Sequence, residues 1–327
     1  MSFKQTISLQ GLFSNSLNKV DEEIFNRLDK TVPLLAKIGS HLIKAKGKRI
    51  RPILTLAMAA QLNDFSKKPI LLATAVEFIH TATLLHDDVV DESDYRRGIK
   101  TANMIWNNEF CVLAGDFLFA QSFDLMVETN SIEALSTLAK ASCQITQGEF
   151  LQIQISNKPD TKLNDYYKVI GGKTAQLFGA ACESGVIVAN GNEVQKEAAF
   201  NYGYNIGLAF QIIDDVIDYT LTKNLSGKNI GDDFKLGKTT LPIILAWEKS
   251  NNKEKEFWER TLKILNQNKN DFQNAKNIMK KYKIIQKCKQ IAKNFVKKSI
   301  LSLKYFPDNE YKTYLLNLAK ESLIRTK

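Results

Sequence analysis

Apolar residues recur every three or four positions along most of the chain, which is the spacing of one face of an α-helix. The clearest tracts of this kind are residues 69–90, 111–129, 131–155, 195–220 and 239–248. Between six prolines the chain is rich in Ala, Leu, Ile, Lys and Gln, which favour helix, and alternating strand patterns are missing where a sheet would need them. The pattern predicts an all-α protein of ten or more helices.

Turn residues and charges interrupt the helical pattern at several places. These breaks fall at residues 63–69, 95–101, 156–163, 190–192 and 223–238. None has the composition of a flexible interdomain linker, and no repeat of solenoid period occurs. A chain of 327 residues has the length of one large or two ordinary domains, and we expect one domain that covers residues 1–327.

The composition narrows the class of protein. With 44% hydrophobic and 24% charged residues, the chain has the make-up of a globular protein and not of a disordered one. The four cysteines stand far apart and include no C-x-x-C pair, which fits neither a disulfide framework nor a zinc site. The first twenty residues lack the features of a signal peptide, and no uninterrupted apolar segment approaches the ~20 residues that span a bilayer. We therefore expect a cytoplasmic protein that does not span a membrane.

A formal net charge of +10 favours anionic partners, such as nucleic acid, acidic lipid surfaces or phosphorylated small molecules. Residues 253–304 hold fifteen Lys or Arg against four Asp or Glu, and apolar residues are interleaved with them at roughly helical spacing. This arrangement is typical of the solvated outer face of peripheral helices, so we expect no nucleic-acid partner. Peripheral contact with a membrane, through this face or through the product, is the alternative.

One acidic motif, D-D-x-x-D, occurs twice in the sequence. The first copy holds Asp87 and Asp91, and the second holds Asp214 and Asp218. Each copy continues an apolar helical run, so we expect both near the C-terminal ends of helices. Residues four apart share a helix face, which pairs the first aspartate of each motif with its last.

Carboxylates this close repel one another, and the negative end of a helix dipole adds to the repulsion, so a cation must compensate. A set of oxygen ligands without a Cys or compact His cluster suits Mg²⁺ better than Zn²⁺. Mg²⁺ completes its shell with water and substrate phosphate, so the two motifs indicate a diphosphate substrate. One such motif alone is more often a solvated helix end, but two copies on apolar stripes favour a metal site.

Basic residues surround both motifs, and several stand beside glycine. They occur in G-K-R-I-R-P (47–52), R-R-G (96–98), G-G-K-T (171–174), G-K (227–228) and G-K-T-T-L-P (237–242). Arginine offers a planar fork, and lysine a point charge, to phosphate oxygens. A phosphate-loop interpretation of the last segment fails, because Gly231 stands at the wrong distance and no strand precedes it.

Two histidines precede the aspartates of the first motif. His80 stands seven residues before Asp87 on the same helix face, so it is either a packed core residue or a substrate contact. His86 is interpreted as a structural residue or as a support for the metal ligands.

The ordered series of motifs resembles the trans-isoprenyl diphosphate synthases, and most closely the long-chain polyprenyl diphosphate synthases that make quinone side chains. The similarity runs from about residue 44 to residue 247. It comprises G-K-R-I-R-P, H-T-A-T-L-L-H-D-D-V-V-D-E-S-D-Y-R-R-G, G-D-F-L, G-G-K-T-A, F-Q-I-I-D-D-V-I-D and G-K-N-I-G-D-D-F-K-L-G-K-T-T-L-P. The resemblance implies one domain of antiparallel helices around a deep central cavity, and a homodimer.

The resemblance also implies a role for each motif residue. For Mg²⁺ it implies three main ligands, with two supporting ones: Asp87, Asp91 and Asp214, then Asp88 and Asp218. For isopentenyl diphosphate it implies Lys48, Arg51, His80 and Arg97. For the allylic diphosphate it implies Arg96, Lys173, Thr174, Gln211, Lys228 and Lys238. The catalytic set then comprises all six motif aspartates, Asp215 included, with Lys173 and Lys238.

The implied reaction is ionisation of the allylic diphosphate, condensation with isopentenyl diphosphate, and loss of a proton. Metal and cations stabilise the charge on the leaving diphosphate, which is electrostatic catalysis and not nucleophilic attack by the protein. No protein base is required, and the sequence offers no convincing Ser/His/Asp or Cys/His set.

Two small residues before the first motif bear on product length. In members of the family that stop early, aromatic side chains stand four or five residues before this motif, whereas this chain has Ala82 and Thr83. Because Thr83 lies one turn before Asp87, a small side chain there leaves room below the reacting centre. The resemblance therefore implies a C40–C50 product, a quinone side-chain precursor as in ubiquinone, without a choice among octaprenyl, nonaprenyl and decaprenyl. The alternative floor is formed by Phe117, Phe123 or Met126.

Other functions compete with this one. A farnesyl or geranylgeranyl diphosphate synthase, with a shorter product, shares the motifs. A class I terpene cyclase shares the first motif, but its second metal site has an Asn/Ser/Glu pattern. A non-catalytic subunit of a heteromeric synthase commonly lacks aspartates or phosphate-binding cations, and this sequence has them all. A basic helical nucleic-acid binder needs exposed aromatics, whereas we expect inward-facing positions for Phe272, Tyr282 and Phe295.

Overall fold

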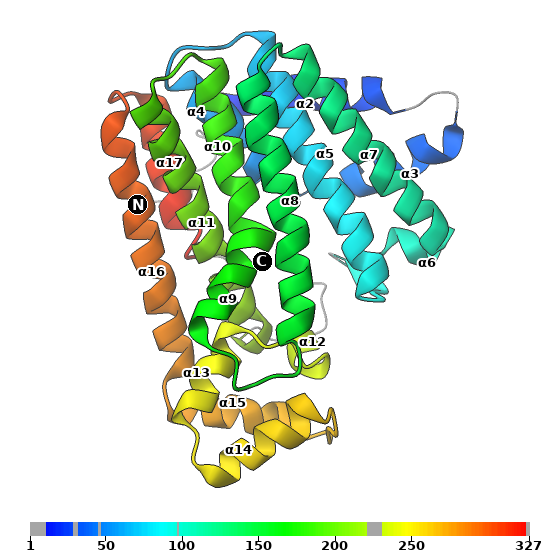
Figure 1. Cartoon of the computed structure of the whole chain (residues 1–327), viewed down its shortest axis with the longest axis vertical. Helices are drawn as coiled ribbons and strands as arrows, with labels where there is room; N and C mark the ends of the chain where they lie inside the picture. The colour runs from blue at the N-terminus through cyan, green and yellow to red at the C-terminus, as the bar shows by residue number, and fades with distance from the viewer. Residues whose placement is uncertain (1–10, 29–31, 45–46, 97, 221–230, 325–327) are drawn as a thin grey trace. The chain divides into compact units, whose positions relative to one another are not determined.

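The computed structural model describes residues 11–28, 32–44, 47–96, 98–220 and 231–324. Within these residues, every regular element is helical except two-residue strands, β1 (Tyr95–Arg96) and β2 (Ile99–Lys100), which pair in antiparallel fashion (Figure 1). The prediction of an all-α fold is confirmed. Each of the five predicted helical tracts is found, with ends that differ from the prediction by three residues at most.

The chain divides into two compact units. Unit 1 comprises residues 1–142, 177–203 and 302–317, and unit 2 comprises residues 143–176, 204–301 and 318–327. The division runs through α8 (Ile132–Ile155), α11 (Glu193–Thr220) and α17 (Glu310–Glu321), and it also separates the first residue of α10 (Gln176–Val188) and the last residue of α16 (Ile284–Ser302) from the rest of those helices. One domain around a deep central cavity stays a prediction.

Unit 1 holds the N-terminal helices and parts of α8, α11 and α17. Its other elements are η1 (Gly11–Phe13), α2 (Ser14–Arg27), α3 (Pro33–Lys44), α4 (Ile50–Ala60), α5 (Lys67–Val90), α6 (Ala102–Trp106), α7 (Asn108–Glu128), α10 (Gln176–Val188) and η4 (Leu303–Tyr305). Pro33, Pro52 and Pro69 lie in the first turns of α3, α4 and α5, where a backbone N–H has no partner within the helix. Proline therefore marks where these helices begin.

Helix α5 packs against α2, α4, α6 and α7 within unit 1. All of residues 71–79 are buried, which explains why this part of the sequence is almost entirely apolar. Each fully buried Leu or Ile side chain contributes about 1.5–3 kcal/mol to stability. Because the helix ends at Val90, this packing fixes the place where the first aspartate motif emerges.

Unit 2 holds the C-terminal parts of α8 and α11 and a series of shorter helices. These are α9 (Leu163–Ile170), the π-helix η2 (Gly171–Ala175), α12 (Asp232–Lys235), α13 (Leu241–Lys249), α14 (Asn252–Trp258), the π-helix η3 (Glu259–Lys263), α15 (Asp271–Lys281) and α16 (Ile284–Ser302). Asn251 and Glu254 form a capping box that opens α14. The buried Trp258 donates its indole N–H to Ser250 Oγ at 2.9 Å, which ties α14 to the end of α13.

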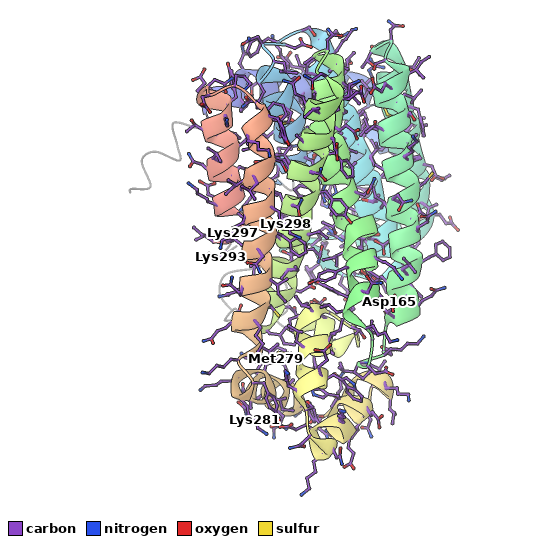
Figure 2. The ribbon with its side chains drawn as sticks, turned by 60° about the vertical axis from the view of Figure 1, so that its left-hand side comes forward. Asp165, Met279, Lys281, Lys293, Lys297 and Lys298 are labelled. Atoms are coloured by element: carbon purple, nitrogen blue, oxygen red, sulfur yellow. The ribbon has the colours of Figure 1, made fainter. Side chains whose placement is uncertain are left out.

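The lysine-rich outer side of α16 faces solvent. Lys289, Lys293 and Lys297 stand four residues apart and are exposed, whereas Ala292 and Val296 on the opposite side are buried. Figure 2 shows Lys293 and Lys297 along this helix. The aromatic residues that a nucleic-acid binder would expose are half-buried: Phe272, Tyr282 and Phe295. The expectation of a solvated outer face is therefore confirmed.

Helices α5 and α7 are each long and apolar enough to cross a membrane, judged by length and composition. Neither helix is an uninterrupted apolar run, because Glu77 and Asp87 interrupt α5 and Asp116 and Asp124 interrupt α7. In α5, 67% of the most apolar stretch is buried, as in the core helix of a soluble protein. In α7 the corresponding share is only 39%, so this helix presents apolar side chains at the surface of unit 1.

Candidate active site

The first aspartate motif lies at the C-terminal end of α5, as the sequence predicts. Asp87 is in the last turn, and Asp91 is the C-cap and donates its backbone N–H to the Asp87 carbonyl at 2.8 Å. Both residues are half-buried. Since residues four apart share a helix face, the helix end carries a pair of carboxylates that a ligand can reach.

Asp88 has a different environment from its two neighbours in the motif. It is 2% exposed, and its carboxylate accepts hydrogen bonds from Arg96 Nε at 2.9 and 3.1 Å, with Arg96 Nη2 at 2.8 Å. The loop after α5 turns back toward the motif, because the Ser93 N–H donates to the Asp88 carbonyl at 3.0 Å. Asp88 and Arg96 thus bind each other through charge-assisted hydrogen bonds. The role of Asp88 as a supporting metal ligand stays a prediction.

His86 packs against helix α7. Its Nε2 lies 3.2 Å from the Val112 carbonyl oxygen and 3.5 Å from Asp116 Oδ1. A Cβ atom at Gly115 would collide with the imidazole ring. The glycine of the G-D-F-L motif therefore makes room for His86, which favours the structural interpretation of this histidine.

The residues predicted to hold isopentenyl diphosphate belong to unit 1. Lys48 is exposed just before α4, and Arg51 lies in the first turn of α4 with its guanidinium 4.4 Å from the ring centroid of Phe178. His80 is half-buried on α5, and its carbonyl accepts a hydrogen bond from Thr83 Oγ1 at 2.8 Å. The last member of this set lies outside the described residues: Arg97.

The two residues predicted to control chain length differ in burial. Ala82 is buried in the core of unit 1, whereas Thr83 is half-buried. On α7, Phe117 and Phe123 are half-buried and Met126 is buried. Of the two positions before the first motif, Thr83 is therefore the one that the core does not fully enclose.

The second aspartate motif lies in the last two turns of α11, again at a helix C-terminal end. Asp214 is half-buried. Asp218 accepts hydrogen bonds from the N–H groups of Gly231 at 3.3 Å and Asp233 at 3.2 Å, at the start of α12. A carboxylate there satisfies N–H groups that have no partner within the helix. Asp218 thereby anchors α12, a role that the sequence did not predict.

Asp215 is the centre of a buried hydrogen-bonded chain. It is 3% exposed and accepts from the Tyr166 hydroxyl at 2.6 Å and from Gln211 Nε2 at 2.9 Å, and Thr174 Oγ1 in turn donates to Gln211 Oε1 at 2.9 Å. Burial, with the negative charge of Asp233, raises the pKa of Asp215 to about 7, although the two hydrogen bonds act in the opposite direction. The chain joins two residues predicted to hold the allylic diphosphate. Tyr166 belongs to no motif, so nothing in the sequence marked it.

Lys173 and Thr174 lie in the π-helix η2, which packs closely on α8. Cβ atoms at Gly148 or Gly172 would collide with the backbone of the other segment, so only glycine allows this approach. Lys173 Nζ reaches Glu149 Oε1 of α8 at 2.5 Å. The G-G-K-T motif therefore fits a lysine and a threonine onto one short turn. Glu149 was not predicted, because its partner comes from a distant segment.

Lys238 is half-buried and follows α12. Its segment is tied to the loop after α8, because the Asn157 N–H donates to the Gly237 carbonyl at 3.0 Å and the Lys158 N–H donates to Thr239 Oγ1 at 3.3 Å. Unit 2 thus brings the G-K-T segment next to the end of a helix eighty residues earlier. The remaining predicted lysine, Lys228, lies outside the described residues.

The donor atoms of both motifs suit a hard cation. Among the residues that the structure describes, no three His, Cys, Asp or Glu side chains come together closely enough to hold a metal by themselves. Mg²⁺ needs no such group, because it binds one or two carboxylates and completes its shell with water and substrate phosphate. Asp87, Asp91 and Asp214 are half-buried and stay the predicted main ligands, with Asp88 and Asp218 as the predicted supporting ones.

Residues 32–281 match the family model of polyprenyl synthetase. The octaprenyl diphosphate synthase of Haemophilus influenzae is 38% identical over 97% of this chain and 96% of its own length. The all-trans-nonaprenyl-diphosphate synthase (geranyl-diphosphate specific) of Rhodobacter capsulatus is 37% identical over 94% of each chain. A crystal structure of polyprenyl synthase from Caulobacter crescentus, in complex with calcium and isoprenyl diphosphate, is similar with a TM-score of 0.94 at 42% identity, over 98% of this chain and 97% of that one. The chain belongs to the polyprenyl synthetase family and is a polyprenyl diphosphate synthase, a prenyltransferase.

Proposed function

We propose that the protein uses Mg²⁺ to condense isopentenyl diphosphate with an allylic diphosphate, repeatedly, into an all-trans polyprenyl diphosphate of C40–C50. The observation that carries the proposal is the pair of aspartate motifs, each at a helix end, with cations that are predicted to bind phosphate in the same unit. Full-length similarity to synthases of octaprenyl and nonaprenyl diphosphate supports the long product. Such a product is a precursor for the side chain of a quinone.

Asp87, Asp91 and Asp214 would hold Mg²⁺ in this proposal. When bound, the metal supplies positive charge that stabilises the departing diphosphate. The carboxylates of a motif bring negative charge to a helix C-terminus, which is unfavourable without a cation nearby. Holding the cation is therefore the main task of these side chains.

Other side chains of the protein bind and orient the two diphosphates. Lys48, Arg51 and His80 would hold isopentenyl diphosphate, as would Arg97. For the allylic diphosphate, the residues are Arg96, Lys173, Thr174, Gln211, Lys228 and Lys238. Fixed cations aimed at the leaving group lower the barrier because they need no reorganisation as charge develops. The proton lost in the last step goes to the released diphosphate, so no side chain acts as a base.

A direct turnover experiment tests the proposed function. Purified protein with Mg²⁺, isopentenyl diphosphate and farnesyl diphosphate should give elongated polyprenyl diphosphates, which chromatography of the products identifies by length. A chelator should abolish the activity, and added Mg²⁺ should restore it, because the carboxylates alone repel the substrate. A cyclised hydrocarbon as product, or turnover that persists in the chelator, would contradict the proposal.

We further propose that the exposed apolar side of α6 and α7 is covered by a second copy of the chain. These helices expose Met104, Ile105, Phe110, Leu113 and Val127. Large apolar side chains gathered at a surface mark a partner interface or a membrane contact. Helix α7 carries four acidic residues and no Lys or Arg, so an anionic membrane would repel it. A protein partner fits this surface better.

Replacement of Leu113 by glutamate is expected to convert a dimer into a monomer, because the substitution places a charge in an apolar interface. Analytical ultracentrifugation of wild type and variant measures the change. Leu301→Glu is the matched control, since Leu301 is equally exposed on α16. An unchanged dimer in the Leu113 variant, or wild-type protein that is monomeric and sediments with phosphatidylcholine vesicles, would contradict this assignment.

A further inference from the structure

Arg49, the third residue of G-K-R-I-R-P, has an unusual backbone conformation, and the reaction described above does not use its side chain. Its φ and ψ angles are 52° and 33°, in the left-handed region that residues other than glycine rarely adopt. Arg49 is the N-cap of α4, and its carbonyl accepts a hydrogen bond from the Ile53 N–H at 3.1 Å. The conformation of Arg49 therefore determines the direction in which the chain passes from Lys48 into α4.

The Arg49 side chain is held by acidic residues of two other helices. Its Nη1 forms a close ion pair with Glu77 of α5, and its Nη2 lies 3.3 Å from Asp21 Oδ1 of α2. The side chains of Arg49 and Glu77 are 15% and 12% exposed. Removal of Arg49 from a pair this well buried takes away the positive charge that compensates Glu77, and removal of Glu77 leaves Arg49 with the more exposed Asp21 alone. The pair therefore resists separation and keeps the strained turn in place.

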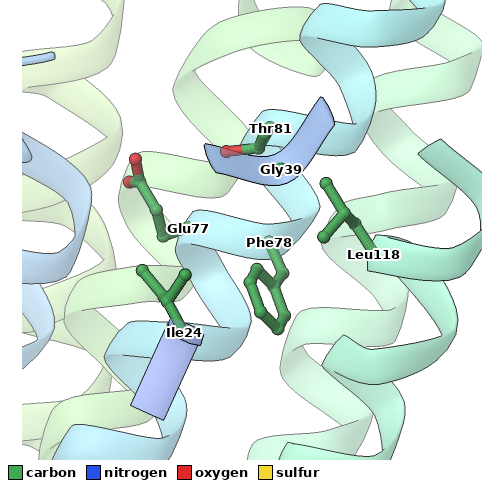
Figure 3. Close-up of a pocket in the computed structure, with 6 residues that line it drawn as sticks. All are labelled: Ile24, Gly39, Glu77, Phe78, Thr81 and Leu118. Carbon is green, nitrogen blue, oxygen red and sulfur yellow. The ribbon is translucent and has the colours of Figure 1, made fainter. Parts of the chain in front are cut away.

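Glu77 is a partner for Arg49 and not a substrate contact. It lines a cavity of about 10 Å³, together with Ile24, Gly39, Phe78, Thr81 and Leu118. Figure 3 shows its carboxylate on the side of α5 where Ile24 lies, away from Leu118. A pocket for a small molecule needs about 300 Å³ or more, so no substrate fits there.

The ion pair joins two segments that carry predicted substrate contacts. Lys48 precedes Arg49, Arg51 follows it by two residues, and His80 lies three residues after Glu77 on the same side of α5. We propose that Arg49 is a positioning residue, whose ion pair with Glu77 holds Lys48 and Arg51 in place relative to His80 for binding the diphosphate of isopentenyl diphosphate. The inference rests on the proposed function, because it assigns these three residues to that substrate.

Loss of the pair should act on one substrate more than on the other. Without Glu77 to hold it, the turn relaxes to an ordinary conformation and Lys48 shifts relative to α5. A displacement of about 1 Å in a binding group can cost about a hundredfold in rate. The allylic diphosphate is assigned to different residues, so its KM should change little.

Kinetics of Arg49→Met, Arg49→Lys and Glu77→Gln test the proposal. We expect the KM for isopentenyl diphosphate to rise roughly tenfold or more in the Met and Gln variants, and less in the Lys variant, which keeps the charge but loses the planar fork. The KM for farnesyl diphosphate should stay within about twofold. Circular dichroism and Tm show whether each variant is folded. If the Met and Gln variants do not fold, the KM values of the Lys variant test the proposal.

Arg27→Met provides the matched control. Arg27 is 16% exposed, lies on α2 of the same unit, and contacts Glu23, Asp124 and Glu128, so it is as buried as Arg49 and is also held by acidic residues. Its loss should lower Tm without changing either KM. The proposal is overturned if the Arg49 variants behave in the same way, or if both KM values rise together. Calorimetry measures the binding of isopentenyl diphosphate to the wild-type protein. If the wild type does not bind it, the proposed function is wrong. If the wild type binds it and the Arg49 variants bind it equally well, the positioning role alone is wrong.

Discussion

Alanine in place of Asp87 or Asp214 is expected to lower the rate of chain elongation by about a hundredfold or more. Each substitution removes a half-buried carboxylate that would hold Mg²⁺ beside the leaving diphosphate. The fold should survive, because a negative charge at a helix C-terminus does not stabilise the helix. Steady-state kinetics with isopentenyl and farnesyl diphosphates measures the loss, and the Mg²⁺ concentration for half-maximal activity should rise.

Asp94→Ala is the matched control for this prediction. Asp94 is an exposed carboxylate in the loop that follows the first motif, and among the described residues of that loop it makes contacts through its backbone carbonyl only. Its removal should leave the rate within about twofold, since exposed charges interact weakly in water. If Asp87→Ala retained wild-type turnover, the assignment of the motif to the metal would be wrong.

Phenylalanine in place of Thr83 is expected to shorten the product by several five-carbon units. Thr83 is half-buried and lies one turn before Asp87, so an aromatic ring there would obstruct the path of the growing chain. Ala82 is a worse site for the same test, because overpacking a buried position costs about 1–3 kcal/mol. Chromatography of the products from the variant and the wild type measures the shift.

Leu84→Phe is the control for product length. Leu84 is also half-buried, but it is rotated by about 100° from Thr83 around α5. Its product distribution should match the wild type. If the Thr83→Phe enzyme made products of unchanged length, other residues would limit the growing polyprenyl chain. Phe117 and Phe123 on α7 would then be the next positions to replace.

The helices and the positions of both motifs were predictable from the sequence. Hydrophobic periodicity is a local property, and it defined α5 and α11 up to the turn in which each motif stands. Glycine and charge marked the loops at 95–101 and 156–163 for the same reason. The hairpin of β1 and β2 was not predicted, because two-residue strands are too short to produce an alternating pattern.

The different contacts and burial of the motif aspartates were not predictable. The sequence does not distinguish Asp88 and Asp215 from the other motif aspartates. In the structure, however, Asp88 binds Arg96, and Asp215 binds Tyr166 and Gln211. Tyr166 and Asp215 are 49 residues apart, so their contact depends on how α9 packs against α11. Spacing on a helix shows which residues share a face, but burial by other elements decides which of them keep access to a ligand.

The exposed side of α7 was overlooked for a related reason. The sequence of α7 is apolar on most of its circumference, which by itself fits a helix buried on every side. Only the packing of unit 1 shows that Leu113 and Val127 remain uncovered. Composition therefore predicted that the helix is apolar, whereas the packing of neighbouring elements determines which of its side chains stay exposed.

The wide turn at Gly171–Ala175 makes this part of the chain sensitive to length as well as to side-chain identity. A π-helix contains one residue more per turn than the α-helices around it. Deletion of a single residue would rewind the segment as ordinary helix and rotate Lys173 away from Glu149 and Thr174 away from Gln211. In the proposed function this segment holds the allylic diphosphate, so an insertion or deletion here should lower activity even when Lys173 and Thr174 are both retained.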